Sequence, residues 1–169
     1  MKTLSIVRHA KAETAGAAAA DFRRPLTARG KKDARHIGRL LARIEPAIDW
    51  IIASPSARTR STVAAMVEIV DYSGTLQWEE RAYLGEAETW LQLLSAVPPE
   101  IEHVALVGHN PGIAELVAGL TSGVPSRLNL HFPTAAVAHL AVDIFWWNQI
   151  RWGCGELRML ITPKYLRKK

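Results

Sequence analysis

Cysteine is almost absent from this chain of 169 residues, in which Cys154 is the only one. A single thiol cannot form an intramolecular disulfide, and it cannot supply a metal site that is built from several cysteines. Such sparing use of cysteine is typical of a reducing compartment. We therefore expect a cytoplasmic protein.

Long hydrophobic runs are also missing. No apolar stretch reaches the roughly 18 residues that a membrane-spanning helix needs. The apolar run at residues 4–7 is too short to be the hydrophobic region of a signal peptide. These two absences predict a protein with no membrane partner.

Several well-known functional motifs are absent. The chain has no glycine-rich phosphate loop ending in Gly-Lys, no dinucleotide-binding glycine turn, no His-Glu-x-x-His and no Gly-x-Ser-x-Gly elbow. It also lacks the interleaved aromatic and basic residues of a nucleic-acid-binding motif. We therefore expect no nucleic-acid partner, although a non-catalytic binder of phosphate or nucleic acid stays open as a lesser alternative.

Acidic residues are the minority charge. The chain has 21 Lys and Arg against 16 Asp and Glu, for a net charge of +5 and a pI of about 9.7. A basic protein attracts acidic partners, such as phosphorylated substrates. Part of the charge crowds the last six positions, which we interpret as a solvated end, with the cations Lys164, Arg167, Lys168 and Lys169.

The hydrophobic pattern predicts alternating strands and helices. Apolar residues make up 49% of the chain and charged residues 22%, as in folded globular proteins. We expect one domain over residues 1–169, with a largely parallel sheet and antiparallel additions near the C-terminus. The expected strands cover 4–7, 49–53, 75–78, 103–107, 136–142 and 157–162. The expected helices cover 28–44, 55–70, 87–96 and a segment from 111 to Gly123, and the alanine-rich segment 14–20 is expected to be a mobile loop.

Three of the predicted strands end in polar, chemically active residues. Arg8-His9 follows the first strand, Ser54-Pro55 and then Arg58 follow the second, and Gly108-His109-Asn110-Pro111 follows the fourth. The carboxyl ends of parallel strands meet at one edge, where ligands bind in open α/β sheets. We also expect Ser54 and Asn110 to be helix N-caps, each with proline as the first helical residue.

The residue types at this edge point to phosphoryl chemistry. Arginine binds phosphoryl oxygens in a bidentate way that lysine cannot reproduce. A histidine among arginines stays neutral and nucleophilic, while a second histidine could stay protonated against a bound phosphate and stabilise the transition state. The strand ends offer no carboxylates for a metal. The four remaining histidines have no partners visible in the sequence, and we expect surface or satisfied core positions for His36, His103, His131 and His139.

Three tryptophans lie near the C-terminus, at Trp146, Trp147 and Trp152. An exposed aromatic cluster can be a docking surface. We favour the alternative, in which these side chains belong to the core beside the edge strands.

Four segments, in this order, resemble the landmarks of the histidine phosphatase superfamily, also called phosphoglycerate mutase-like. They are Val7 to Glu13, Arg24 to Gly30, Ser54 to Thr62, and Val107 to Pro111. The resemblance spans roughly residues 1–142. The short chain, and alanine instead of glycine after the histidine, are most similar to SixA-type phosphohistidine phosphatases. The resemblance implies a three-layer α/β/α sandwich with a mostly parallel central sheet.

The resemblance also implies roles for residues at matching positions. His9 would be the nucleophile that becomes phosphohistidine, and Arg8, Arg58 and His109 would hold the phosphoryl group. No metal and no organic cofactor would be needed. Glu80 is the best positional match for a general acid, with Glu86 and Glu13 as alternatives, and a phosphoramidate leaving group needs less help from an acid.

The substrate expectation comes from length. The connections are short, so the basic pocket should be open, which favours phosphohistidine on a protein. The alternative is a phosphatase or mutase that acts on a small phosphomonoester such as a sugar phosphate.

Overall fold

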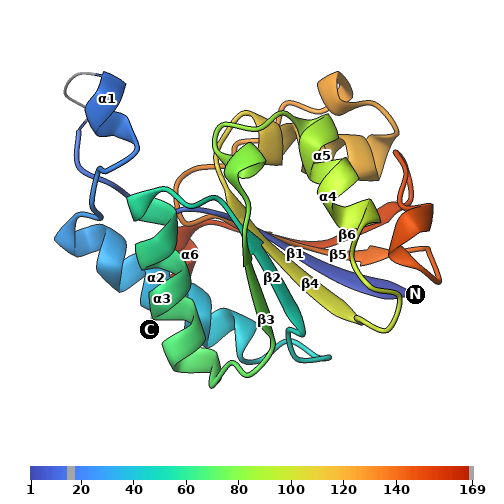
Figure 1. Ribbon diagram of the computed structural model, residues 1–169, viewed down its shortest axis with the longest axis horizontal. Coiled ribbons are helices and arrows are strands. Elements are labelled where there is room, and N and C mark those ends of the chain that lie inside the picture. Colours follow the sequence, from blue (N-terminus) through green and yellow to red (C-terminus); the bar gives the residue numbers. More distant parts are fainter. Residues whose placement is uncertain (15–17, 168–169) are drawn as a thin grey trace.

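A six-stranded sheet forms the centre of the protein in a computed structural model, which describes residues 1–14 and 18–167. The spatial order of the strands is β3-β2-β4-β1-β5-β6 (Figure 1). Their bounds are β1 Lys2–Arg8, β2 Trp50–Ala53, β3 Thr75–Trp78, β4 His103–Gly108, β5 Val137–Val142 and β6 Gly155–Ile161.

The strand directions confirm the predicted sheet. The pairs β1–β4, β2–β4 and β2–β3 are parallel, whereas β5 pairs antiparallel with β1 and β6 antiparallel with β5. The carboxyl ends of β1, β2 and β4 therefore lie at one edge, as the sequence predicts.

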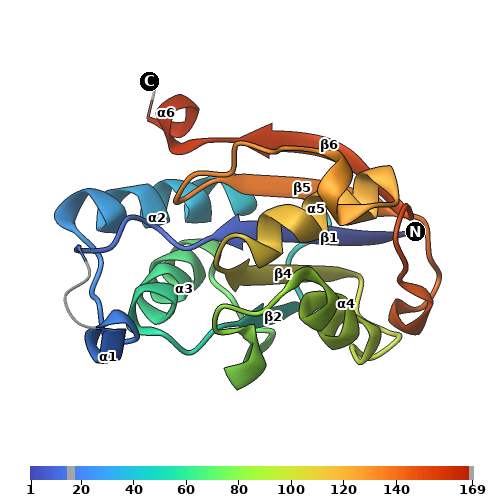
Figure 2. The ribbon, with the colours of Figure 1, turned by 90° about the horizontal axis from the view of Figure 1, so that it is seen from above.

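Helices cover both faces of the sheet and complete a three-layer α/β/α sandwich (Figures 1 and 2). On one face lie α2 (Ala28–Leu41), α3 (Ala57–Val70) and the short α6 (Pro163–Leu166), and on the other lie α4 (Ala87–Ser95) and α5 (Gly112–Ser122). The connections include α1 (Ala18–Asp21) and the 3₁₀ turns η1 (Glu80–Ala82), η2 (Pro125–Arg127) and η3 (Trp147–Gln149). Within the described residues, no helix combines the length and apolar character that crossing a membrane requires.

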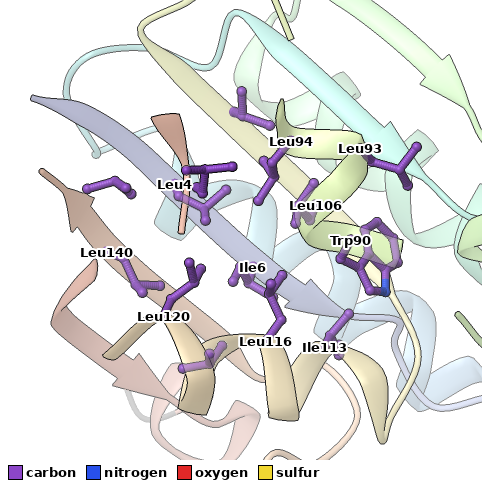
Figure 3. Packing of buried hydrophobic residues seen from close by; sticks show 14 of the residues in the cluster. Leu4, Ile6, Trp90, Leu93, Leu94, Leu106, Ile113, Leu116, Leu120 and Leu140 are labelled. Carbon is purple, nitrogen blue, oxygen red and sulfur yellow. The ribbon is translucent and has the colours of Figure 1, made fainter. Parts of the chain in front are cut away.

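Each face of the sheet buries its own hydrophobic core. On the α4–α5 face, Leu4 and Ile6 of β1 and Leu106 of β4 pack with side chains from both helices, and the helix residues drawn in Figure 3 include Trp90, Leu94, Ile113 and Leu116. A central strand that is buried on both faces has almost no polar position to spare. The polar residues at the ends of β1 and β4 therefore mark the edge at which the strands leave the hydrophobic core.

Several element boundaries differ from the sequence predictions. Residues 18–21 form α1 where a mobile loop was expected, and residues 15–17 of that expectation lie outside the described residues. Helix α2 begins after the predicted N-cap Thr27, whose side chain accepts from the backbone N–H of Gly30, but it ends at Leu41. The next residues continue as tighter turns, with Arg43 N–H bonded to the carbonyl of Leu40.

The C-terminal segment is attached to the sandwich. Arg167 binds the buried carboxylate of Asp33 on α2 through two nitrogens, at 2.7 and 2.8 Å. The expectation of a wholly solvated basic end is thus wrong for Arg167, because a buried carboxylate needs a cationic partner. Lys168 and Lys169 lie outside the described residues.

The tryptophans divide between core and surface. Trp147 is fully buried and donates its indole N–H to the carbonyl of Ile101 at 2.8 Å. Trp152 is partly buried against the same core, whereas 56% of Trp146 is exposed. The prediction that these side chains belong to the core is therefore correct for Trp147 and Trp152. Both lie in the connection between β5 and β6 and not in the strands themselves.

Candidate active site

Three strand ends bring the predicted site residues together. Arg8 is the last residue of β1, and the N–H of His9 still bonds to the carbonyl of Gly108 at the end of β4. His109 follows Gly108 directly, and its ring lies 5.1 Å from that of His9, centroid to centroid. Gly108 is required here because a Cβ at this position would lie 2.4 Å from a ring carbon of Trp90.

The ring of His9 is held in one tautomer. Its Nδ1 lies 2.8 Å from the carbonyl oxygen of Ala10, and a carbonyl can only accept, so Nδ1 carries the proton. The lone pair is therefore on Nε2, which accepts a hydrogen bond from Nε of Arg58 at 3.2 Å. The backbone N–H of Ala10 donates to the hydroxyl of Thr62 on α3, so the residue after the histidine is also anchored. His9 thus presents a fixed, unprotonated nitrogen to the arginine.

Burial and nearby cations keep His9 neutral. Burial, together with the smaller effects of the charges of Arg58, Arg8 and Arg24, lowers the pKa of His9 to about 4, although the hydrogen bond to Ala10 opposes this change. The lowered pKa agrees with the expectation of a neutral histidine among arginines, and the nucleophilic role of His9 stays a prediction. The largest cause, however, is loss of water around the ring and not the arginines.

His109 also bonds to Arg58, next to His9. Its Nδ1 accepts from Nη2 of Arg58 at 3.2 Å, so its Nε2–H donates to the hydroxyl of Ser54 at 2.7 Å. Burial lowers the pKa of His109 to about 3, with further contributions from His9 and Arg58. The ligand-free protein thus holds this ring neutral, whereas the sequence argument considered a protonated ring against bound phosphate.

Arg58 is the centre of the site. It stands in the first turn of α3, only 2% of it is exposed, and its guanidinium bonds to both histidine rings. The same group donates to the backbone carbonyl of Asp21 at 2.7 Å and to its carboxylate at 3.1 Å. These contacts fix the plane of the guanidinium, and they connect α3 to the short helix α1.

Asp21 joins three polar side chains at the mouth of the site. Its carboxylate accepts from Arg58, from Arg24 at 2.9 Å and from the hydroxyl of Tyr83 at 2.6 Å. The hydrogen bond from Tyr83 is the largest cause that lowers the pKa of Asp21 to about 2, followed among the lowering causes by Arg24 and Arg58. A carboxylate that stays ionised here holds two arginines in place.

Arg8, the residue before His9, lines a cavity of about 560 Å³. Its Nη1 donates to the carbonyl of Phe132 at 2.9 Å, and the amide of Asn110 donates to the same carbonyl. Within the described residues, Nε of Arg8 is buried without a hydrogen-bond partner, and an anion at the cavity wall could supply one. The cavity is lined by Arg8, Asn110, Asn129, Leu130, His131, Phe132, Pro133 and Thr134.

Both predicted helix N-caps are wrong at this edge. Helix α3 begins at Ala57 after Ser56, and α5 begins at Gly112 after Pro111. Ser54 and Asn110 use their side chains on His109 and on the carbonyl of Phe132 instead. Both residue types are good caps, and here their polar groups complete the site.

The three candidate acids are not part of the hydrogen-bonded cluster. Glu80 begins the 3₁₀ turn η1 with an exposed side chain, Glu86 is exposed before α4, and Glu13 is exposed in the connection after β1. Tyr83 is the residue of the loop after β3 that reaches the site, with its ring edge-on to His109 at 5.5 Å. The general-acid role of Glu80 stays a prediction.

Four residues of the cluster escaped the sequence argument as site residues: Asp21, Arg24, Ser54 and Tyr83. Asp21 and Arg24 lie in a segment without hydrophobic periodicity, so no pattern aims them at the strand ends. The sequence argument did place Ser54 at a chemically active strand end, but it gave this residue the role of a helix N-cap and not of a partner of His109. No group of three or more His, Cys, Asp or Glu side chains that could hold a metal occurs in the described part of the chain.

An α/β/α sandwich with histidines and arginines at the carboxyl edge of its parallel strands defines a class of phosphoryl-group hydrolases. The family model of the histidine phosphatase superfamily (branch 1) matches residues 4–103. The chain belongs to this superfamily, and it is a phosphatase.

Three relatives show how far the similarity extends. An uncharacterised protein of Mycobacterium tuberculosis is 29% identical over 164 residues, which cover 94% of this chain and all of the relative. The structure of a protein from Nakamurella multipartitia, provisionally assigned as the phosphohistidine phosphatase SixA, matches with a TM-score of 0.82 and 29% identity over 96% of both chains. A protein from Agrobacterium tumefaciens with the same provisional assignment matches with a TM-score of 0.77 and 29% identity, over 96% of this chain and 99% of that one.

Proposed function

We propose that this protein removes phosphoryl groups from phosphohistidine on proteins, through a phosphohistidine intermediate on His9. The observation that carries the proposal is the fixed tautomer of His9, whose unprotonated Nε2 faces the guanidinium of Arg58 at 3.2 Å. A neutral imidazole with a positioned lone pair is a nucleophile at neutral pH. The similarity to two proteins provisionally assigned as SixA supports phosphohistidine as the substrate.

The reaction has two steps. In the first, Nε2 of His9 attacks phosphorus, a P–N bond to His9 forms, and the P–N bond to the substrate imidazole breaks with its electron pair staying on the departing nitrogen. In the second, water attacks phosphorus, the bond to His9 breaks, and inorganic phosphate leaves. The first step transfers the phosphoryl group from one nitrogen to another, and the second transfers it from nitrogen to the oxygen of water. No oxidant or reductant is involved.

The remaining residues stabilise the transferred group. Arg58 and His109 lie beside His9, Arg8 directly precedes it, and all three would place positive charge or hydrogen-bond donors on the phosphoryl oxygens. A bound dianion would replace Arg58 as the partner of His9, and it would favour protonation of His109. We propose that no metal and no organic cofactor takes part.

The leaving group decides whether an acid is needed. A phosphorylated imidazole that is protonated on its free ring nitrogen leaves as neutral imidazole, so no enzyme acid has to act on it. For a phosphomonoester, an alkoxide would have to be protonated, and Glu80 is then our candidate, with Glu86 and Glu13 as alternatives. We further propose a cytoplasmic location, because the single cysteine suits a reducing compartment.

A direct comparison of substrates tests this function. We expect kcat/KM on a phosphohistidine peptide to exceed that on each of a panel of sugar phosphates by orders of magnitude. The opposite preference would favour the alternative, a phosphatase or mutase of a small phosphomonoester. Binding of phosphate compounds with no turnover of either class would instead indicate a non-catalytic binder.

A further inference from the structure

A groove between α2 and α3 starts beside the active site. Arg58 lies in the first turn of α3, while the N–H of Thr27, the N-cap of α2, bonds to the carbonyl of Lys11, two residues after the nucleophile, at 2.9 Å. The two helices run in the same direction, because Gly38 of α2 packs against Met66 and Ile69 of α3. Both helices therefore lead away from the pocket (Figures 1 and 2).

A cavity of about 310 Å³ occupies this groove close to its active-site end. Lys31 and Arg35 lie in the first two turns of α2, a length of about 11 Å. The opposite wall of the groove is formed by residues of α3, and among these Glu68 is the one farthest along the helix from Arg58. The lining residues are Lys31, Arg35, Ser61, Ala64, Ala65 and Glu68.

The cations of this groove have no charged partner. In the described parts of the chain, Lys31 and Arg35 make no ion pair and no side-chain hydrogen bond, and both are exposed. The only acid on α2 is Asp33, which is buried and bound to Arg167. Cations in the first turns of a helix also oppose its dipole. An acidic ligand would pair with these cations and would offset their unfavourable interaction with the helix dipole.

We propose that the α2–α3 groove docks an acidic segment of the protein whose phosphohistidine enters the site. This inference rests on the proposed function, which leaves the protein substrate unspecified, and it adds that the segment around the phosphohistidine is acidic. A concave floor of small residues, Ala64 and Ala65, between a basic wall and the opposite helix suits a peptide segment. None of the six lining residues is aromatic, whereas single-stranded nucleic acid is usually bound by stacking on aromatic rings.

Two synthetic peptides of equal length test the groove. Both carry one histidine, which is flanked by Asp and Glu in one peptide and by Asn and Gln in the other, and each is used with and without chemical phosphorylation. We expect kcat/KM for the acidic phosphopeptide to be about tenfold higher at low salt, with the advantage shrinking as ionic strength rises. The unphosphorylated acidic peptide should bind more tightly than the neutral one by a similar factor.

Charge reversal in the groove should remove this preference. The variant Lys31→Glu/Arg35→Glu is expected to lose about tenfold or more on the acidic peptide relative to its own rate on free phosphohistidine. The matched control is Arg151→Glu/Arg158→Glu, which changes the net charge equally at two exposed positions near β6. The control should keep both the preference and the turnover of the wild type.

The outcomes separate this proposal from the proposed function. Equal kcat/KM for both peptides, or a preference that survives in the groove variant, overturns the docking groove while leaving phosphohistidine hydrolysis intact. Failure to hydrolyse both phosphopeptides and free phosphohistidine overturns the function, and binding of the unphosphorylated peptides then still decides the groove. Tighter binding of a single-stranded RNA oligonucleotide than of the acidic peptide, abolished by the same variant, would also overturn the proposal.

Discussion

The described residues include two pairs of neighbouring histidines, of which only His139 is not fully buried, and the surroundings of the two pairs differ. His9 and His109 end β1 and β4, while His103 and His139 lie within the sheet on β4 and β5. In each pair burial is the first cause of a lowered pKa, and in each pair a serine hydroxyl bonds to a ring. Neutral buried rings alone therefore do not identify a catalytic site.

The two pairs differ in what faces the ring nitrogens. In the second pair, Nδ1 of His103 donates to the carbonyl of Pro46 at 2.7 Å and Nε2 accepts from Ser5 at 2.9 Å, so both nitrogens have ordinary neutral partners. The hydroxyl of Ser5 also bonds to His139 at 3.1 Å. In the first pair, a buried guanidinium bonds to both rings beside a cavity. The concentration of cations at the edge of the sheet is what distinguishes the first pair from the second.

Removal of the proposed nucleophile is the strongest way to test this contrast. We expect His9→Ala to lower kcat by at least about 10³-fold, since no other group can form the covalent intermediate. Trapping of an acid-labile, base-stable phosphoenzyme from a phosphate donor should label the wild type and not this variant. His139→Asn, a change in the second pair, should label like the wild type. Equal labelling of His9→Ala would refute the mechanism.

Replacement of the central arginine should have the next largest effect. Arg58→Ala removes a buried donor aimed at the developing charge, and we expect kcat to fall by about 10²–10³-fold. Arg58→Lys should recover little of this loss, because an ammonium cannot contact His9, His109 and Asp21 in one plane. Steady-state rates measure both variants. Near-normal turnover of Arg58→Lys would show that charge alone, and not the fork geometry, matters.

Asp21→Asn should weaken catalysis through Arg58. We expect kcat/KM to fall by about tenfold, on the scale of loss of a supporting residue around a reactive group. Because the folded pKa of Asp21 is about 2 and the unfolded value is about 3.9, its ionised form stabilises the wild type above about pH 4. That contribution disappears as the pH falls toward 2.

The pH dependence of stability tests whether the ionised carboxylate of Asp21 is what supports Arg58. Denaturation of the wild type and of Asp21→Asn at pH 2 to 6 should show a smaller acid-induced loss in the variant. Tyr83→Phe removes the largest cause of the low pKa and leaves the carboxylate, so it should cost less activity. If Asp21→Asn keeps full activity, Asp21 has no role in holding Arg58.

Most of the fold was predictable from the sequence, because buried strands have a simple pattern. The run at 103–107 and the alternation at 136–142 identify β4 and β5 within a residue at either end. Helix starts were less predictable, since Ser54 and Asn110 are good caps in isolation and tertiary contacts use them otherwise. Local propensity cannot distinguish these two uses.

The strand-borne part of the site was also predictable, and the loop-borne part was not. Arg8 ends β1, and His9 and His109 directly follow β1 and β4, so the topology alone brings them to one edge. Asp21 and Tyr83 arrive from connections whose paths depend on many tertiary contacts. The sequence contains no periodic signal for such contacts.

The smallest effect on activity is expected from the second histidine pair. Ser5→Ala leaves ring nitrogens of His103 and His139 without their hydroxyl partner, and we expect the free energy of unfolding to fall by about 1–3 kcal/mol. Turnover should stay within about twofold of the wild type, because Ser5 lies within β1 and away from its carboxyl end. Urea denaturation and steady-state rates at neutral pH measure the two quantities.

The acid sensitivity of the fold completes this contrast. The folded pKa of His103 is about 4 and the unfolded value about 6.5, so between these values the unfolded chain binds more protons. Stability is therefore complete above about pH 6.5 and is lost as the pH falls toward 4. His9 and His109 act in the same direction, so His103→Asn should reduce this pH dependence only in part. An unchanged pH dependence in His103→Asn would mean that the ring is already charged in the folded protein, and the hydrogen bond from Ser5 would then have to be reversed.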